Sequence, residues 1–213
     1  QGAHLGHADA SLDADGAMRW FYLSAGWEQA NLPHMAQALL ATDGQAIHPN
    51  ISKRLTHEGQ DRYSANHWLR AQRLPIRYIG PPGTIEHISY GALLRDEVPP
   101  EKLAGRYVLI GATAVGLGDS HPTPVSRLNG PMSSVEITAQ IFQMLRTGDG
   151  LRIAPPLAVG LGSASLVMLL MGACWRLSPR RSLLLSLALI VTIPLSCILG
   201  LGAGLWFPPS SFV

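Results

Sequence analysis

The hydrophobic pattern of the chain changes sharply near residue 154. Residues 157–175 and 182–206 form two apolar runs without a charged side chain, separated by a short basic segment. As α-helices, these runs would extend roughly 28 and 37 Å, enough to cross a hydrocarbon core of about 30 Å. A buried helical hairpin in a soluble protein is the weaker alternative, because core helices are shorter and rarely apolar on every face. The pattern therefore predicts an α-helical transmembrane hairpin surrounded by membrane lipid.

The basic segment predicts the direction of this hairpin. Arg176, Arg180 and Arg181 lie close to the ends of both runs, and short basic loops stay on the cytoplasmic side. Both outer ends would then face away from the cytoplasm. We therefore expect a protein of the inner (plasma) membrane whose preceding domain is periplasmic or extracellular. Such a domain needs an export signal or a transmembrane helix before residue 1.

Small residues recur four apart along both runs, at Gly160 and Ala164 and at Gly200 and Gly204. This spacing lets helices approach closely in lipid. We expect a homodimer, because a relative shift of packed helices between protomers can transmit a ligand's binding energy. A monomer with an intramolecular helical bundle would use the same small residues. Neither run holds an ionisable side chain, which argues against a transport role.

Before residue 154 the pattern predicts one α/β domain, of a length that allows a real core. Predicted strands cover residues 17–23, 74–79 and 106–110, predicted helices cover 32–41, 89–95 and 134–146, and 48–68 is a loop with room for a short helix. The run 106–110 is typical of a strand covered on both faces. Ser133 and Glu136 have the spacing of a capping box, and Gly148 would end the helix that they open.

These boundaries divide the chain into five segments. We expect an extracytoplasmic domain at 1–153, a transmembrane helix at 154–177, a cytoplasmic turn at 178–181, a second transmembrane helix at 182–206 and an outer-side segment at 207–213. A Pro-Pro pair at 155–156 would form a stiff joint between the domain and the first transmembrane helix.

Polar residues suggest where the domain binds a ligand. The run 106–110 leads into a glycine-bearing loop and then a capped helix, and ligands of such units sit at the carboxyl end of the strand. The candidate ligand-binding residues are Asp13, Asp15, Arg19, Thr113, Asp119, Thr123 and Glu136. The alternative is that Asp119 and Glu136 only accept hydrogen bonds from backbone donors in a tight loop.

Charge and motifs argue against several functions. The chain carries 16 basic and 14 acidic side chains, but the 12 basic and 14 acidic ones of residues 1–149 leave that part slightly acidic, which disfavours nucleic-acid binding. The calcium-loop-like start at Asp13 lacks its later ligands, and no phosphate-binding lysine motif occurs. The eight histidines lack metal-site spacing, and no nucleophile elbow is present. We expect no catalytic residue, metal or cofactor in this chain.

Several motifs, in order, resemble the second family of CHASE domains, extracellular sensors associated with cyclases and histidine kinases. The motifs are HAD at 7–9, DADGAMR at 13–19, YIGPPGT at 78–84, ISY at 88–90, LAGRYVLIGAT at 103–113, GLGD at 116–119, TP at 123–124 and VEITAQ at 135–140. The resemblance covers nearly all of the soluble part and extends into the membrane region.

The resemblance implies a sensor with one preceding and three following transmembrane helices, and then a cytoplasmic output domain. The output enzymes of such receptors include histidine kinases, nucleotide cyclases and diguanylate cyclases. We therefore expect a membrane receptor of a bacterial type that detects an unknown extracytoplasmic signal and controls an enzyme outside this chain. The alternative is a membrane-anchored envelope interaction domain without enzymatic output. A further alternative, an extracytoplasmic hydrolase, lacks a nucleophile.

Overall fold

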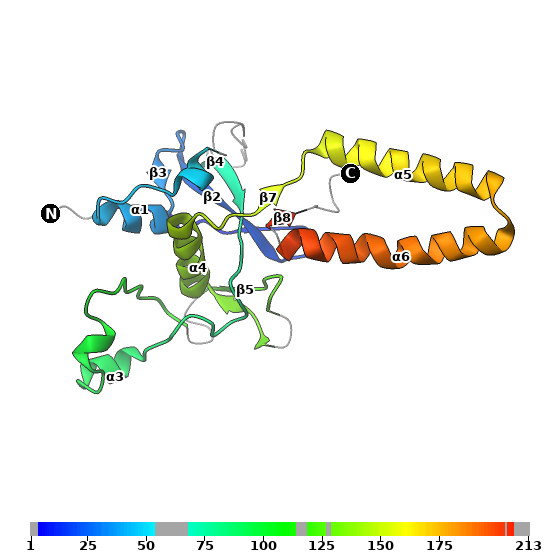
Figure 1. The fold of residues 1–213 in the computed structure, drawn as a ribbon. Coiled ribbons are helices and arrows are strands. Elements are labelled where there is room, and N and C mark those ends of the chain that lie inside the picture. Colours follow the sequence, from blue (N-terminus) through cyan, green and yellow to red (C-terminus); the bar gives the residue numbers. More distant parts are fainter. Residues whose placement is uncertain (1–3, 54–67, 114–118, 127–128, 203, 207–213) are drawn as a thin grey trace. The chain divides into compact units, whose positions relative to one another are not determined.

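The computed structural model describes residues 4–53, 68–113, 119–126, 129–202 and 204–206. The chain forms two compact units, Gln1–Gly150 and Leu151–Val213. The first unit is a mixed α/β domain, and the second contains two long apolar helices. Figure 1 labels their elements.

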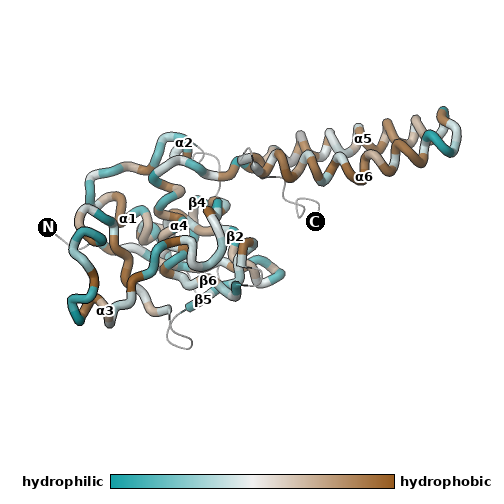
Figure 2. The backbone as a smooth tube through the Cα atoms, turned by 60° about the horizontal axis from the view of Figure 1, so that its bottom comes forward, coloured by the Kyte–Doolittle hydropathy of each residue, from teal (hydrophilic) through white to brown (hydrophobic). Residues whose placement is uncertain are grey.

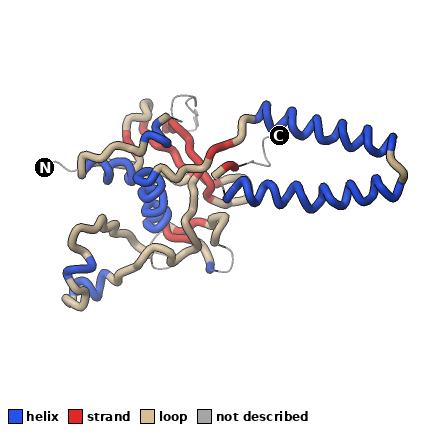
Figure 3. The backbone as a smooth tube through the Cα atoms, in the orientation of Figure 1, coloured by secondary structure: helices blue, strands red, loops and turns tan. Residues whose placement is uncertain are grey.

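The first unit is built on an antiparallel sheet around one long strand. β2 (Met18–Trp27) pairs with β1 (Ser11–Leu12), β3 (Leu32–Pro33) and β4 (Trp68–Pro75). A separate two-stranded ladder joins β5 (Ser120–His121) to β6 (Met132–Ser133). Figure 3 shows the long loop stretches that connect these elements. The sheet positions the polar residues of the 9–19 segment beside those of β4.

Helical segments accompany the strands in the described part of the first unit. They are α1 (Met35–Thr42), α2 (Pro49–Ser52), α3 (Tyr90–Leu94), the 3-10 helix η2 (Pro100–Lys102) and α4 (Ser134–Thr147). α4 begins and ends as its sequence predicts. The Ser133 hydroxyl accepts a hydrogen bond from the backbone N–H of Glu136, and Gly148 closes the helix in the left-handed conformation, at φ 78°.

The core of the first unit gathers buried side chains from β2, α1, β4, β6 and α4. Its largest fully buried members include Phe21, Leu23, Leu40, Met132 and Ile141. α1 packs against α4. α4 contributes Ile141, Phe142 and Leu145 to this core. The core therefore joins the sheet to the helix whose amino end was expected near the ligand.

The predicted strand at 106–110 is wrong, since the structure has no strand there. Tyr107 packs its ring on Phe142 at 4.7 Å between centroids, but the side chains of Val108 and Ile110 are 49% and 76% exposed. Within the described residues, no strand pairs with this segment. A β-rich apolar run becomes a strand only when a partner pairs with its backbone, and the expected strand–loop–helix unit is absent for that reason.

Two other strand and helix boundaries differ from the sequence prediction. The strand predicted at 74–79 lies earlier, as β4, and includes Arg70 and Arg73. The helix predicted at 32–41 starts only at Met35, because Leu32–Pro33 pairs with β2 as β3.

Other predicted elements are confirmed. β2 contains most of the strand predicted at 17–23, α3 is the short helix predicted at 89–95, and α2 is the short helix after residue 48. Residues 54–67 and the central part of the glycine-bearing loop lie outside the described residues.

The second unit contains α5 (Pro156–Arg176) and α6 (Pro179–Gly202). Both are long and apolar enough to cross a membrane by length and composition. Figure 2 shows the apolar character along both helices and the hydrophilic turn between them. A two-residue parallel ladder pairs β7 (Arg152–Ile153), before α5, with β8 (Leu205–Trp206), after α6.

Gly204 does not share a helical face with Gly200, contrary to the sequence prediction. α6 ends at Gly202, and Gly204 lies beyond it at φ 80°. Its carbonyl accepts a hydrogen bond of 2.7 Å from the Arg152 N–H. This conformation suits glycine and leads the chain out of the helix into β8.

Candidate functional site

The predicted residues Asp13, Asp15 and Arg19 form one ion-paired group. The Arg19 guanidinium donates to a carboxylate oxygen of Asp13 at 2.8 Å and to both oxygens of Asp15 at 2.8 and 2.7 Å. Asp15 also accepts from the Ala17 N–H, which closes the turn before β2. The bonds from Arg19 and Ala17 lower the pKa of Asp15 to about 2. The strand start thus holds three charged residues in a fixed arrangement.

Arg73 of β4 extends this group. One guanidinium nitrogen lies 3.7 Å from the second oxygen of Asp13, and the guanidinium carbon lies 4.2 Å from the centroid of the Trp20 ring. Such stacking on an indole face favours the cation and fixes its plane. Asp15, with its side chain 57% exposed, is the member of this group that a solute reaches most easily.

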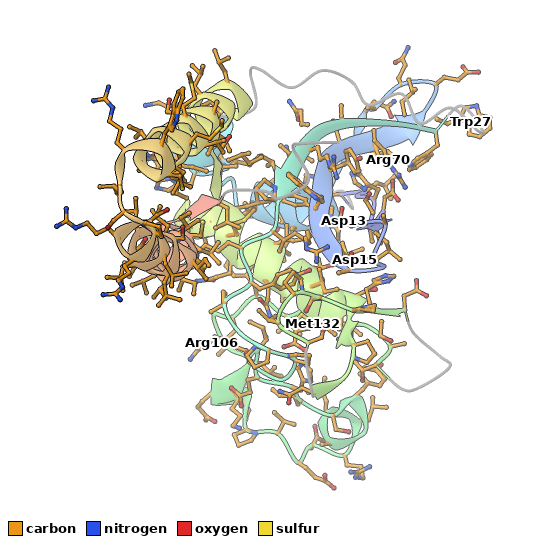
Figure 4. The ribbon with its side chains drawn as sticks, turned by 90° about the vertical axis from the view of Figure 1, so that its right-hand side faces the viewer. Asp13, Asp15, Trp27, Arg70, Arg106 and Met132 are labelled. Atoms are coloured by element: carbon orange, nitrogen blue, oxygen red, sulfur yellow. The ribbon has the colours of Figure 1, made fainter. Side chains whose placement is uncertain are left out.

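A second ion-paired group, which the sequence analysis missed, lies farther along the same sheet. Asp9 accepts from Arg70 through both carboxylate oxygens, at 2.6 Å for the Nη2 bond, and from the Trp68 indole N–H at 2.9 Å. Burial raises the pKa of Asp9, but the bonds from Arg70 and Trp68 outweigh it and the net pKa is lowered. Arg70 also lies over the Tyr22 ring. Figure 4 shows Asp13, Asp15 and Arg70 along one side of the β2–β4 pair.

Glu136 serves a different part of the domain. Its side chain is buried, and its carboxylate accepts from the backbone N–H groups of Gly83 at 2.9 Å and Ile85 at 3.4 Å. His87 lies 3.5 Å from the second oxygen. Glu136 therefore does what the alternative interpretation of this residue expected, since it holds backbone donors of a loop.

Gln140, one turn farther along α4, holds the same loop. Its side-chain oxygen accepts from the Ile79 N–H at 2.8 Å and its amide donates to the Gly80 carbonyl at 3.3 Å. Two of the sequence motifs, 78–84 and 135–140, thus contact each other directly. A signal for this role was present, because a glutamate and a glutamine four residues apart share one helical face.

Of the remaining predicted residues, Asp119 and Thr123 lie on either side of β5, whereas Thr113 does not belong to the ladder of β5 and β6. Thr123 is buried and its hydroxyl lies 2.8 Å from that of Ser126. Asp119 is exposed, and its backbone carbonyl accepts from both the N–H and the hydroxyl of Ser134. Thr113 is exposed and borders residues that are not described. In the part of the chain that the structure describes, no hydrogen bond or ion pair joins these residues to the Asp13 group or to Glu136.

The two groups on the sheet are the best candidate for contact with a polar solute. They combine three carboxylates with three guanidiniums, on an aromatic background, so a charged ligand can exchange for an existing ion pair. Among the described residues, no three His, Cys, Asp or Glu side chains gather as metal ligands would.

The chain thus has a mixed α/β domain that is followed by two long apolar helices. A protein-family model described as the CHASE2 domain matches residues 1–174. The chain belongs to the CHASE2 family, so it is an extracellular sensor domain of signalling receptors. Searches of curated proteins and of solved structures gave no match.

Proposed function

We propose that this chain is the sensor and membrane-entry region of a receptor that controls a cytoplasmic output enzyme. The observation that carries the proposal is the extent of the family match, which continues from the α/β domain into α5. Sensor and first apolar helix thus belong to one family unit. Histidine kinases, nucleotide cyclases and diguanylate cyclases are the output enzymes that such a receptor would control. An envelope interaction domain with a simple anchor is not favoured by this match.

The proposed topology places α5 and α6 across the inner membrane as a hairpin. Arg176, Arg180 and Arg181 lie at the turn between the helices and would stay in the cytoplasm. The α/β domain would then be periplasmic or extracellular. The domain boundaries predicted from the sequence, at 153, 177, 181 and 206, belong to this proposal.

The proposed ligand surface is centred on Asp13, Asp15 and Arg19. Asp119 and Thr113 would add to it as exposed residues, while the buried Thr123 and Glu136 would support the loops around it. The contacts of Arg19 support this choice, since a guanidinium held between two carboxylates can exchange an ion-pair partner when a charged ligand binds. The signal itself would be a small polar molecule or ion outside the cytoplasm.

Deletion of residues 4–150 from the full-length receptor tests the proposed function. We expect the output enzyme to keep its basal activity and lose its response to extracytoplasmic conditions. The response would be measured as product formation in membrane vesicles, with the unmutated receptor as the control. A receptor that responds equally well without residues 4–150 would contradict the proposal.

A further inference from the structure

Two histidines face each other in the interior of the α/β domain. The rings of His7 and His34 meet edge to face with centroids 5.3 Å apart, and His34 meets Phe21 of β2 in the same way at 5.3 Å. Their residues are 7% and 2% exposed. A pair of imidazoles so close and so buried can remain there only in the neutral form, because two adjacent buried cations would repel each other without solvent.

Both rings act as hydrogen-bond acceptors for the backbone. His34 is the N-cap of α1, and its Nδ1 accepts from the Ala36 N–H at 3.2 Å. His7 Nδ1 accepts from the Asp9 N–H at 3.3 Å. A proton on Nδ1 turns each acceptor into a donor that faces another donor. For His34 the new charge would also lie at the positive end of the helix.

Backbone bonds connect this pair to three elements. The His34 N–H donates to Leu23 of β2, the His7 N–H donates to Pro33 of β3, and the Met35 N–H donates to His7. Loss of the ring contacts would therefore loosen the start of α1 where it meets the sheet. α4 packs against α1, so the effect would reach the helix that holds the 79–85 loop.

The charged groups around the pair act on its protonation in opposite directions, and burial has the largest effect. Asp9 favours the protonated rings, but Arg70 already pairs with Asp9 and disfavours a charge on His7. Asp9 and His121 are the other titratable groups on a small cavity that His34 lines, and α4 contributes Ser134, Ile137, Thr138 and Ile141 to it. The Nε2 of His7 makes no hydrogen bond of ordinary geometry, although the Leu23 carbonyl favours its protonated form.

We propose that the His7–His34 pair is an acid-sensitive switch, in which protonation of either ring releases the amino end of α1 from the sheet. The inference goes beyond the proposed receptor function and does not depend on it. Burial, and then the neighbouring His7, lower the pKa of His34 to about 3 from an ordinary 6.5, with a smaller opposing effect of Asp9. Burial also lowers the pKa of His7. The neutral histidine pair therefore contributes its full stabilisation of the fold above about pH 6.5. This stabilisation is lost progressively as the pH falls below that value.

Hydrogen exchange of the whole chain in detergent micelles tests the switch. Between pH 7 and pH 5, the opening constant of α1, corrected for intrinsic exchange rates, should rise about 25-fold for His34 alone. His34→Asn keeps an acceptor at the Nδ1 position but cannot be protonated, so its α1 should show a much smaller change. His48→Asn is the matched control, since His48 caps α2 with the same Nδ1 bond and its replacement should leave α1 as acid-sensitive as before.

Carbon-13 spectra of the histidine rings in the unmutated chain give a second measurement that needs no variant. His34 should stay neutral to below pH 5 while α1 remains closed. A His34 signal that titrates near pH 6.5, an unmutated α1 that is equally protected at pH 7 and pH 5, or an unchanged pH response in His34→Asn would each overturn the proposal.

Discussion

At the residue scale, the domain relies on side chains that hold the backbone of distant segments. Glu136 and Gln140 accept from and donate to the loop at 79–85, and the Tyr78 hydroxyl donates to the Met18 carbonyl at 2.8 Å. The loop has little secondary structure of its own, so these bonds decide its path. Residues of the sensor motifs therefore position one another, and only some of them remain available to a ligand.

Glu136→Ala should destabilise the domain by about 1–2 kcal/mol, because the N–H groups of Gly83 and Ile85 lose their acceptor in a partly buried place. Urea unfolding of the full chain in micelles, followed by circular dichroism, measures this change. Asp119→Ala is the control, since its side chain is exposed and should change stability by no more than about 0.5 kcal/mol.

The same pair of variants separates structure from ligand contact. If Asp119 belongs to the ligand surface, Asp119→Ala will abolish the receptor's response while its stability is unchanged. Equal losses of stability in the two variants would contradict the distinction drawn between a buried and an exposed carboxylate.

At the element scale, local signals explain which parts of the fold could be predicted. The sequence predicts α4 to within one residue because its apolar spacing lies within the helix, and its cap Ser133 and Gly148 lie directly beside its ends. The strand of β4 is predicted too late in the chain, because its charged Arg70 is neutralised only by Asp9, which lies 61 residues away. No local sequence pattern indicates this ion pair. The group of Asp13, Asp15 and Arg19 could be found because its members lie within six residues. The His7–His34 pair could not, since it depends on the course of β2, β3 and α1.

Gly148→Ala should destabilise the end of α4 more than Gly16→Ala destabilises the turn before β2. Both glycines have nearly the same positive φ, 78° and 77°, so both substitutions cost about 1 kcal/mol of backbone strain. A Cβ at Gly148 would lie 2.2 Å from His48 Nδ1, whereas one at Gly16 meets nothing within 4 Å. Displacing His48 from its capping bond adds about 1 kcal/mol. Urea unfolding compares the two variants, and equal effects would show that His48 moves without cost.

At the scale of the whole molecule, the topology of α5 and α6 decides how a signal can pass. With Cys174 and Cys197 replaced by alanine, a cysteine introduced by Ser178→Cys should not react with a membrane-impermeant maleimide in intact cells. It should react after the membrane is opened, because the proposed topology places the basic turn in the cytoplasm. A cysteine introduced by Ser11→Cys, in the α/β domain, is the control and should react in intact cells. Labelling at Ser178→Cys from outside would reverse the orientation.

A homodimer would use the small residues of α5. A Cβ at Gly160 meets nothing within 4 Å, so this face is open to a second helix. Gly160→Leu combined with Ala164→Leu should shift the full-length protein toward a monomer's mass in detergent. Gly162→Leu, which lies on the opposite side of the helix from residues 160 and 164, is the control. A monomer's mass for the unmutated protein at all workable concentrations would contradict the dimer.

The parallel ladder of β7 and β8 connects the two ends of the helical segment in the second unit. The residues that lead into α5 are bonded to the residues that leave α6, so the two ends of a segment of some fifty residues lie side by side. In the proposed receptor, a displacement at Arg152 would reach the chain after Trp206 directly, without travelling down one helix and back up the other. A next transmembrane helix would then be driven from its outer end, and α5 and α6 would act as a fixed support beside it.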